Sequence, residues 1–262
     1  MSLYVTMNRC GTSWFQTCLQ SAIDIARGGD GAYAYSNGLF FPTKGMPYRK
    51  LDWRFPLGTL DTAIHREDGP TFGEQFYWHS HNPFSVLRNA RLKKMRIVVQ
   101  VRNILESLES EYFKAKGDPR EQLSEEELLD FDWEKYLAQK IAFYNSWGEV
   151  LTWHGNILLL RYEEMKHSPV DTLREMMEFW GFDIPRESCE EGVRLASKEA
   201  MREHLPKDEW DANPRVSFRG ENFRGILPKA LHARIIDIIK QDLLYDLEYQ
   251  YEYDTPYGFL YS

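Results

Sequence analysis

Residues 4 to 20 read YVTMNRCGTSWFQTCLQ and pass from strand-forming residues, through a short polar turn, into a helical pattern. The apolar and β-forming residues of 2–7 predict a short buried strand, and the apolar spacing of 12–27 predicts an amphipathic helix. A buried strand that turns directly into a helix is the building unit of parallel α/β folds. This stretch therefore favours an α/β fold.

The turn between that strand and helix holds Arg9, Cys10, Gly11, Thr12 and Ser13. Backbone N–H groups at a helix start, together with the helix dipole, favour an anion. The glycine permits close approach of a ligand, the two hydroxyls add donors, and the arginine adds fixed charge. The spacing and the Lys-Ser/Thr ending of a Walker loop are absent. The turn is therefore either a phosphate cradle of another kind or an ordinary glycine turn before a capped helix.

The remainder of the chain continues the alternation of strand and helix. The β-branched run at 95–101 and the apolar run at 156–162 predict two more strands, buried on both faces as in a parallel sheet. Residues 28–73 are rich in glycine, proline and aromatic residues and predict mostly loop with short helical pieces. We expect one domain over residues 1–262, in which helices flank a central parallel sheet and ligands bind at the carboxyl ends of its strands. Further helices are expected at 103–115, 171–181 and 227–247, and a long, broken helical region at 124–153.

Composition narrows the class of protein. The 262 residues carry a formal net charge of -8, which argues against nucleic acid or an anionic membrane as the main partner. The 43% of hydrophobic residues suffice for a sizeable core. No apolar run approaches the length of a membrane span, and the first residues do not follow the pattern of a secretory signal. The three cysteines show no metal-ligand spacing, so we expect reduced thiols in a cytoplasmic protein that uses no metal.

A second candidate phosphate site follows the strand at 95–101. Arg102 lies at the strand end, and Ser110 lies eight residues later, about two helical turns along the next helix. A cation and a hydroxyl placed in this way suit a second phosphate group. The alternative is a surface arginine followed by an asparagine at a helix start.

Together, these two stretches resemble the two donor-binding motifs of the PAPS-dependent sulfotransferase family. The segment MNRCGTSW at 7–14 is similar to the family's Y-P-K-S-G-T-T-W, with arginine and cysteine where the family has lysine and serine. The family's second motif is matched by Arg102, Asn103, Ser110 and Tyr112.

Two later stretches extend the resemblance, which covers residues 4 to about 240. Residues 158–182 are similar to the family's strand, Tyr-Glu-Asp-Met and following helix, which implies that Tyr162 lies near the adenine. The segment FRGENFRG is similar to the family's late Arg-Lys-Gly segment, with Arg219 and Gly220 as counterparts. The family's usual dimer segment is not found, so the oligomeric state stays open.

Members of this family move a sulfonate group from PAPS to a hydroxyl or an amine, which leaves 3′-phosphoadenosine 5′-phosphate (PAP). The resemblance implies a P-loop-like strand–loop–helix and an in-line transfer whose catalysis is largely electrostatic, by analogy with phosphoryl transfer. Trp14 is implied near the adenine, although it also suits core packing on the first helix. The residues assigned to the donor in this way are Arg9, Cys10, Gly11, Thr12, Ser13, Trp14, Arg102, Ser110, Tyr162, Arg219 and Gly220.

Two side chains are expected to act on the reacting groups. The segment WHSHNPFSVL at 78–87 is similar to the family's His-Leu-Pro segment. His81 is preferred over His79 as the base, because Pro83 follows it at the family's interval. Arg9 is expected to act as a charge clamp rather than a general acid, because a guanidinium is effectively never deprotonated.

The acceptor is expected to be a small molecule rather than a protein or a long glycan, because the chain is short and loop-rich, and the negative charge is compatible with a cationic acceptor. Two other functions stay open. A nucleoside-phosphate kinase shares a strand–loop–helix phosphate site, although the Walker lysine and Mg²⁺ ligands are missing, and a non-catalytic nucleotide-binding protein is favoured by the loss of the loop lysine. The aromatic residues that either line an acceptor pocket or belong to the core are Phe40, Phe41, Phe76, Tyr77 and Trp78.

Overall fold

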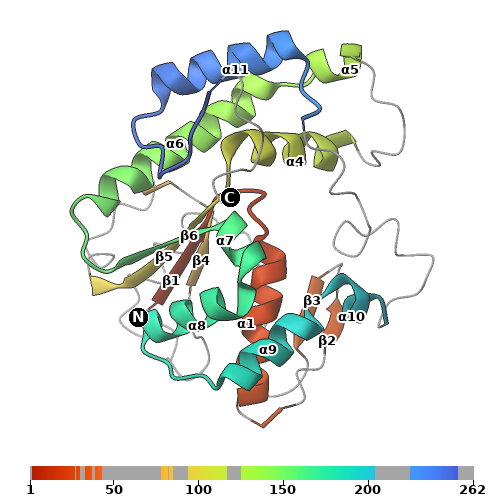
Figure 1. Ribbon diagram of the computed structural model, residues 1–262, viewed down its shortest axis with the longest axis vertical. Helices are drawn as coiled ribbons and strands as arrows, with labels where there is room; N and C mark the ends of the chain where they lie inside the picture. Colours follow the sequence, from red (N-terminus) through yellow and green to blue (C-terminus); the bar gives the residue numbers. More distant parts are fainter. Residues whose placement is uncertain are drawn as a thin grey trace.

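A central sheet of four parallel strands organises the part of the chain that the computed structural model describes. The described residues are 2–26, 28–29, 33–36, 39–42, 78–81, 83–84, 94–116, 125–203 and 225–252. The strands run in the order β4-β1-β5-β6 (Figure 1). They are β1 (Ser2–Thr6), β4 (Trp78–Ser80), β5 (Arg96–Val101) and β6 (Ile157–Arg161). The prediction of a parallel α/β fold is confirmed.

Helices cover both faces of this sheet (Figure 1). The strand residues alternate accordingly: Leu3 and Val5 pack with one helical layer, and Tyr4 packs with the other. All three side chains are fully buried, as expected for an interior parallel strand. The first layer holds α4 (Ile104–Lys116), α6 (Trp133–Leu151) and α11 (Lys229–Asp242), and the second holds α1 (Thr12–Ala26), α8 (Pro169–Trp180) and α9 (Arg186–Leu195).

Residues within 28–73 depart from the sequence prediction. There, β2 (Tyr33–Ser36) and β3 (Leu39–Pro42) pair as antiparallel strands, so the expectation of loop with short helical pieces is wrong for these residues. The residues between the two strands in the sequence are Asn37 and Gly38, a dipeptide that strongly favours a two-residue hairpin. Residues 43–77 lie outside the described residues. They include Phe76 and Tyr77.

Two other expectations, the burial of one strand and the end of the last helix, also differ from the structure. The strand β6 is only half-buried, because it pairs with β5 alone in the described sheet, whereas full burial was expected. The last helix ends at Asp242 rather than near 247, and the chain then returns so that Tyr249 and Tyr251 are buried. The broken helical region expected at 124–153 is observed as two helices, α5 (Glu125–Leu129) and α6, and Asp132 caps α6 by accepting from the Lys135 N–H at 3.2 Å.

Candidate active site

The carboxyl ends of the four parallel strands carry the predicted site residues in one row. His81 follows β4, the loop 7–11 follows β1, Arg102 follows β5, and Tyr162 follows β6 as the first residue of α7 (Tyr162–His167). Four segments that are far apart in the sequence therefore meet at one edge of the sheet. Arg219 and Gly220 lie outside the described residues, as does the side chain of Ser13.

The loop 7–11 has a tightly fixed backbone. The Met7 N–H donates to the Gln100 carbonyl at 2.9 Å, and the Gln100 side-chain amide donates to the Cys10 carbonyl. Both Arg9 (φ 67°) and Gly11 (φ 78°) lie in the left-handed region. This conformation is uncommon for an arginine and needs support from its surroundings.

Gly11 meets a second constraint besides its dihedral angle. A Cβ built on it would lie 2.6 Å from Cε2 and 2.8 Å from Cδ2 of the Tyr162 ring. Real Cβ atoms do not approach a ring so closely. The glycine therefore permits the close contact between the loop and the residue that follows β6.

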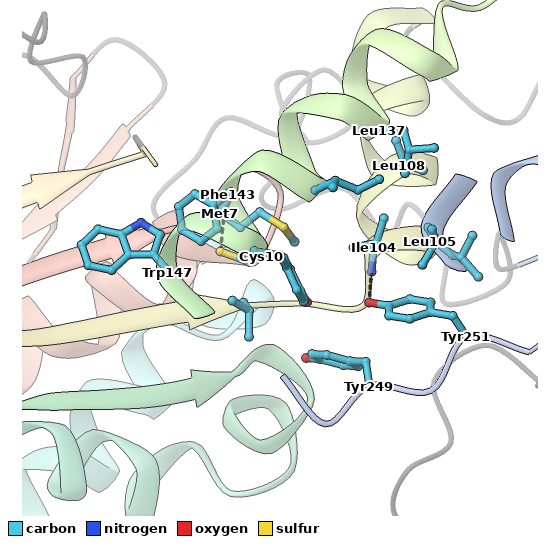
Figure 2. Close-up of a cluster of buried hydrophobic side chains, with 14 of the residues drawn as sticks. Met7, Cys10, Ile104, Leu105, Leu108, Leu137, Phe143, Trp147, Tyr249 and Tyr251 are labelled. Atoms are coloured by element: carbon cyan, nitrogen blue, oxygen red, sulfur yellow. Dashed lines mark hydrogen bonds between the residues drawn. The ribbon is translucent and has the colours of Figure 1, made fainter. Parts of the chain in front are cut away.

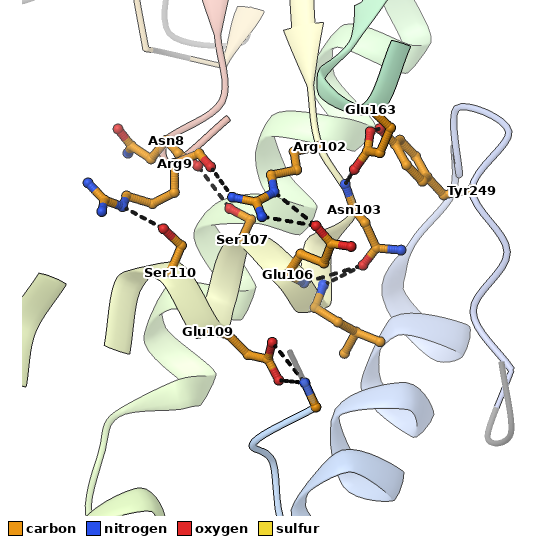
Figure 3. Close-up of polar contacts among 12 residues, drawn as sticks. Asn8, Arg9, Arg102, Asn103, Glu106, Ser107, Glu109, Ser110, Glu163 and Tyr249 are labelled. Atoms are coloured by element: carbon orange, nitrogen blue, oxygen red, sulfur yellow. Dashed lines mark hydrogen bonds and ion pairs between the residues drawn. The ribbon is translucent and has the colours of Figure 1, made fainter. Parts of the chain in front are cut away.

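Arg102 links three parts of the site, and its contacts with the Arg9 carbonyl and with Glu106 can be followed in Figure 3. Its Nη1 donates to the Arg9 carbonyl at 3.1 Å, its Nη2 pairs with Glu106 Oε2 at 2.9 Å, and its guanidinium lies 4.4 Å from the centroid of the Tyr162 ring. The side chain is only 15% exposed, so the alternative of a surface arginine is wrong.

Arg9 joins the loop to α4 directly. Its Nε donates to the Ser110 hydroxyl at 3.2 Å, so the two motifs of the sequence are in contact (Figure 3). Burial lowers the pKa of Arg9, and the nearby Glu111 carboxylate opposes that shift. The ordinary pKa of a guanidinium is so high that Arg9 stays charged.

Three further predicted donor residues, Cys10, Thr12 and Trp14, pack wholly or partly against the core. Cys10 is fully buried beside Met7 (Figure 2), and its thiol donates to the Met7 carbonyl at 2.7 Å. Burial raises the pKa of this thiol to about 11, so it stays neutral. Thr12 is also buried, with its hydroxyl 3.4 Å from the Cys10 sulfur, and Trp14 packs partly against the core beside Phe15. Because its side chain is buried, Cys10 can bind an anion only through its backbone N–H.

His81 contacts the end of β1. Its Nδ1 lies 2.8 Å from the Thr6 carbonyl and 3.0 Å from the Thr6 hydroxyl. A carbonyl only accepts, so a hydrogen bond there places the proton of the neutral ring on Nδ1 and makes Nε2 the basic nitrogen. His79 lies within β4, in register with Tyr4 of β1.

Comparison with known proteins identifies the family. The model of the sulfotransferase domain family matches residues 2–219. The chain belongs to the sulfotransferase family. The sequence prediction of this family is confirmed, and a search of curated proteins finds no match.

Solved structures share the fold of this sulfotransferase. A mouse sulfotransferase complexed with PAP has a TM-score of 0.56 and 15% identity, covering 93% of this chain and 83% of its own. A retinol dehydratase in a complex with retinol and PAP gives the same score and identity, covering 95% and 83%. The retinol dehydratase complex with androsterone and inactive cofactor PAP also scores 0.56 at 15% identity, covering 95% and 82%.

Several polar residues of the sulfotransferase site were not predicted from the sequence. Ser107 donates to the Asn8 carbonyl at 2.9 Å, and Lys140 Nζ lies 3.5 Å from the same oxygen. Glu106 stands four residues after Arg102, but Arg102 precedes α4, so the spacing alone does not indicate a helical ion pair. Lys140 carries no signal either, because helical spacing places it on the buried face of α6 with Leu137 and Tyr144.

The described residues of the sulfotransferase fit a donor with several negative charges. Three cations, Arg9, Arg102 and Lys140, lie on or against the loop, and two of them are paired with the carboxylates of Glu106 and Glu111. In the part of the chain that the structure describes, no three His, Cys, Asp or Glu side chains gather as metal ligands do. No helix among those residues is long and apolar enough to cross a membrane.

Proposed function

We propose that this protein transfers a sulfonate group from PAPS to a hydroxyl or an amine of a small-molecule acceptor, with His81 as the base and Arg9 as the charge clamp. The observation that carries this proposal is the row of strand ends. It places a histidine, a phosphate-loop backbone and an arginine side by side on one sheet edge, where open α/β folds bind their ligands.

The proposed base is supported by its contact with β1. The Thr6 carbonyl favours the tautomer of His81 in which Nε2 accepts a proton. A base in this position removes the acceptor proton as the acceptor attacks. PAPS supplies the sulfonate group, and His81 acts on the acceptor alone.

The proposed donor site divides between the loop and the second motif. Arg9 stays charged and stabilises negative charge on the leaving phosphate, which a group with fixed charge does without a proton transfer. Arg102 and Ser110 are proposed to hold the 3′-phosphate, where a guanidinium and a hydroxyl make charge-assisted hydrogen bonds. Both already contact Arg9, so the two halves of the site are mechanically joined. The remaining proposed donor contacts are the N–H groups of Cys10, Gly11, Thr12 and Ser13, the side chains of Trp14, Tyr162 and Arg219, and Gly220.

Thermal unfolding with nucleotides tests the donor. A ligand that binds only the folded state raises the melting temperature. PAP should therefore stabilise the protein, and ATP with Mg²⁺ should not. Stabilisation by ATP with Mg²⁺ and not by PAP would instead favour a kinase.

Turnover tests the chemistry. Incubation with PAPS and a panel of small hydroxyl and amine acceptors, including cationic amines, should release PAP and form a sulfonated product. Binding of PAP without turnover of any acceptor would indicate a non-catalytic nucleotide-binding protein of the same fold.

A further inference from the structure

Lys140 is a buried cation that the reaction outlined above does not use. It lies in the middle of α6 and is 3% exposed. Its Nζ lies 3.5 Å from the Asn8 carbonyl of the loop and 3.6 Å from Oε1 of Glu111 on α4. Lysine is among the residues that are almost never fully buried unless they are paired.

Stability alone does not account for this lysine. Replacing a buried ion pair by apolar residues of similar volume is often neutral or stabilising, because both charges lose their hydration. The neighbours of Lys140 on the same face of α6 are apolar or aromatic, namely Leu137, Ile141 and Tyr144. An apolar residue would suit that face, so the ammonium is better explained by what it does to the loop.

The loop is held by its carbonyl oxygens. Lys140 and Ser107 both reach the Asn8 carbonyl, and Arg102 donates to the next carbonyl, that of Arg9. In a trans peptide the C=O and the following N–H point in opposite directions. Cations that hold these two carbonyls therefore turn the N–H groups of Arg9 and Cys10 to the opposite side of the loop. The same contacts support the left-handed conformation of Arg9.

We propose that Lys140 is a positioning residue for the donor loop: its ammonium holds the Asn8 carbonyl and places a titratable positive charge beneath the loop, so that affinity for the donor nucleotide depends on its protonation. The inference rests on the proposed function, because it assumes that the loop binds the phosphates of PAPS or PAP. Among the described residues, it adds a pH-sensitive cation to the two arginines of the site, Arg9 and Arg102.

The charged and titratable groups that face Lys140 are Glu111 from α4 and Arg9 and Cys10 from the loop. Burial lowers the pKa of Lys140 to about 8, and Glu111 opposes part of this shift. Arg9 does not titrate in this range, and burial raises the pKa of Cys10 to about 11. Lys140 is therefore the group of this set that changes charge between pH 7 and pH 9.5.

Isothermal titration of PAP at constant ionic strength from pH 7 to pH 9.5 tests the proposal. The second ionisation of a phosphate, near pH 6, is already about nine-tenths complete at pH 7, so it contributes little over this range. The affinity of the unmodified protein should fall by about 10- to 30-fold, as linkage to one proton requires. Lys140→Arg keeps the charge and removes the titration, so its affinity should match the parent at pH 7 and stay flat. Lys140→Met should bind about tenfold more weakly at pH 7, with little further change.

Two controls make the result independent of how well the variants fold. Lys135→Met removes an exposed lysine from the same helix and should leave the pH profile unchanged. Titrations of the unmodified protein at pH 8.5 in buffers of different ionisation enthalpy should show an uptake of about 0.7 proton on binding PAP.

The outcomes separate this inference from the proposed function. PAP binding with no proton uptake at pH 8.5, or a Lys140→Arg profile as steep as that of the parent, overturns the role of Lys140 and leaves the proposed function standing. Failure of the unmodified protein to bind PAP at any pH overturns both.

Discussion

The contact of His81 Nδ1 with the Thr6 carbonyl favours one ring nitrogen as the base. When Nδ1 donates to the Thr6 carbonyl at 2.8 Å, Nε2 is the nitrogen with which the proposed base accepts a proton. We expect His81→Ala to lose about 10²- to 10⁴-fold in turnover and to bind PAP almost normally, since the base acts on the acceptor. Steady-state rates and PAP titrations check this. His79→Ala is the matched control, and a collapse in that variant with near-normal turnover in His81→Ala would reverse the assignment.

The charge of Arg9 is expected to matter more than its shape. Arg9→Lys keeps a cation at the loop and should retain substantial activity. Arg9→Ala should lose more in turnover than in PAP affinity, because a cation that meets developing charge stabilises the transition state most. Measurement of kcat and of the dissociation constant of PAP for both variants checks this. If Arg9→Ala turns over like the parent, Arg9 is not a charge clamp.

At the scale of residues, the sequence indicated which side chains gather but not what they touch. The loop, Arg102, Ser110 and His81 were all predicted as site residues, and the structure brings them to one sheet edge. The packing of α4 and α6 against the loop determines the contacts made there. Arg102 donates to the Arg9 carbonyl, and Ser107 and Lys140 both reach the Asn8 carbonyl. Contacts of that kind arise between elements and leave no periodic signal in the sequence.

Among the elements, the loop between β1 and α1 depends on Gly11. Gly11→Ala should remove PAP binding, because a Cβ there meets the Tyr162 ring at 2.6 Å and is also strained by a φ of 78°. Gly28→Ala is the matched control, since Gly28 also has a positive φ of 83° but nothing lies within 4 Å of its Cβ. Both variants should lose about 1 to 3 kcal/mol of stability from strain, measured by urea unfolding. Only Gly11→Ala should lose the nucleotide, and retention of PAP by that variant would contradict the close packing.

The helix α4 is expected to distinguish PAPS from adenosine 5′-phosphosulfate, which lacks the 3′-phosphate. Ser110→Ala should weaken PAPS about tenfold, which is the loss of one hydrogen bond to a charged group, and leave the shorter donor almost unchanged. Arg102→Ala should weaken PAPS further, but it should also weaken the shorter donor, because Arg102 holds the loop through the Arg9 carbonyl. Titration of each variant with both nucleotides checks this, and equal losses in Ser110→Ala would remove the second motif from donor recognition.

The elements that the sequence missed have weak apolar patterns. The buried face of α9 is formed largely by Ser188, Cys189 and Gly192, small residues that do not register as hydrophobic. Gly192 lets α9 approach α1 closely, since a Cβ there would lie 2.7 Å from the Cys18 carbonyl oxygen. By contrast, β5 is continuous and β-branched, and its predicted bounds differ from the observed ones by one residue.

At the scale of the whole molecule, distant parts of the chain converge on α4. The Ile104 N–H donates to the Tyr251 hydroxyl at 3.3 Å (Figure 2), and the Asn103 N–H donates to Glu163, which in turn accepts from Tyr249 (Figure 3). The helix that carries the second motif is thus fixed by segments from beyond residue 160. No local pattern in the sequence could have predicted these attachments.

Glu109 forms the attachment with the clearest consequence for pH. Its carboxylate, buried in α4, accepts from the Gly225 and Ile226 N–H groups, each at 3.0 Å. Burial raises the pKa of Glu109 from 4.5 to about 7, and the two N–H groups oppose part of that shift. Between pH 4.5 and pH 7, Glu109 is protonated to a greater extent in the folded protein than in the unfolded chain. Its contribution to stability is therefore present at pH 4.5 and lost as the pH rises through 7.

We therefore expect the free energy of unfolding of the unmodified protein, measured relative to Glu109→Gln, to fall by up to about 3 kcal/mol between pH 4.5 and pH 7. Glutamine keeps a carbonyl that can accept from Gly225 and removes the titration, so the difference isolates this one group from all others. Urea unfolding at half-unit steps of pH measures it. Glu149→Gln, an exposed Glu-to-Gln change on α6, is the matched control. A flat difference for Glu109→Gln would mean that the carboxylate is already ionised at pH 4.5, and that the segment at 225–226 is held to α4 by a charge at every pH in the window.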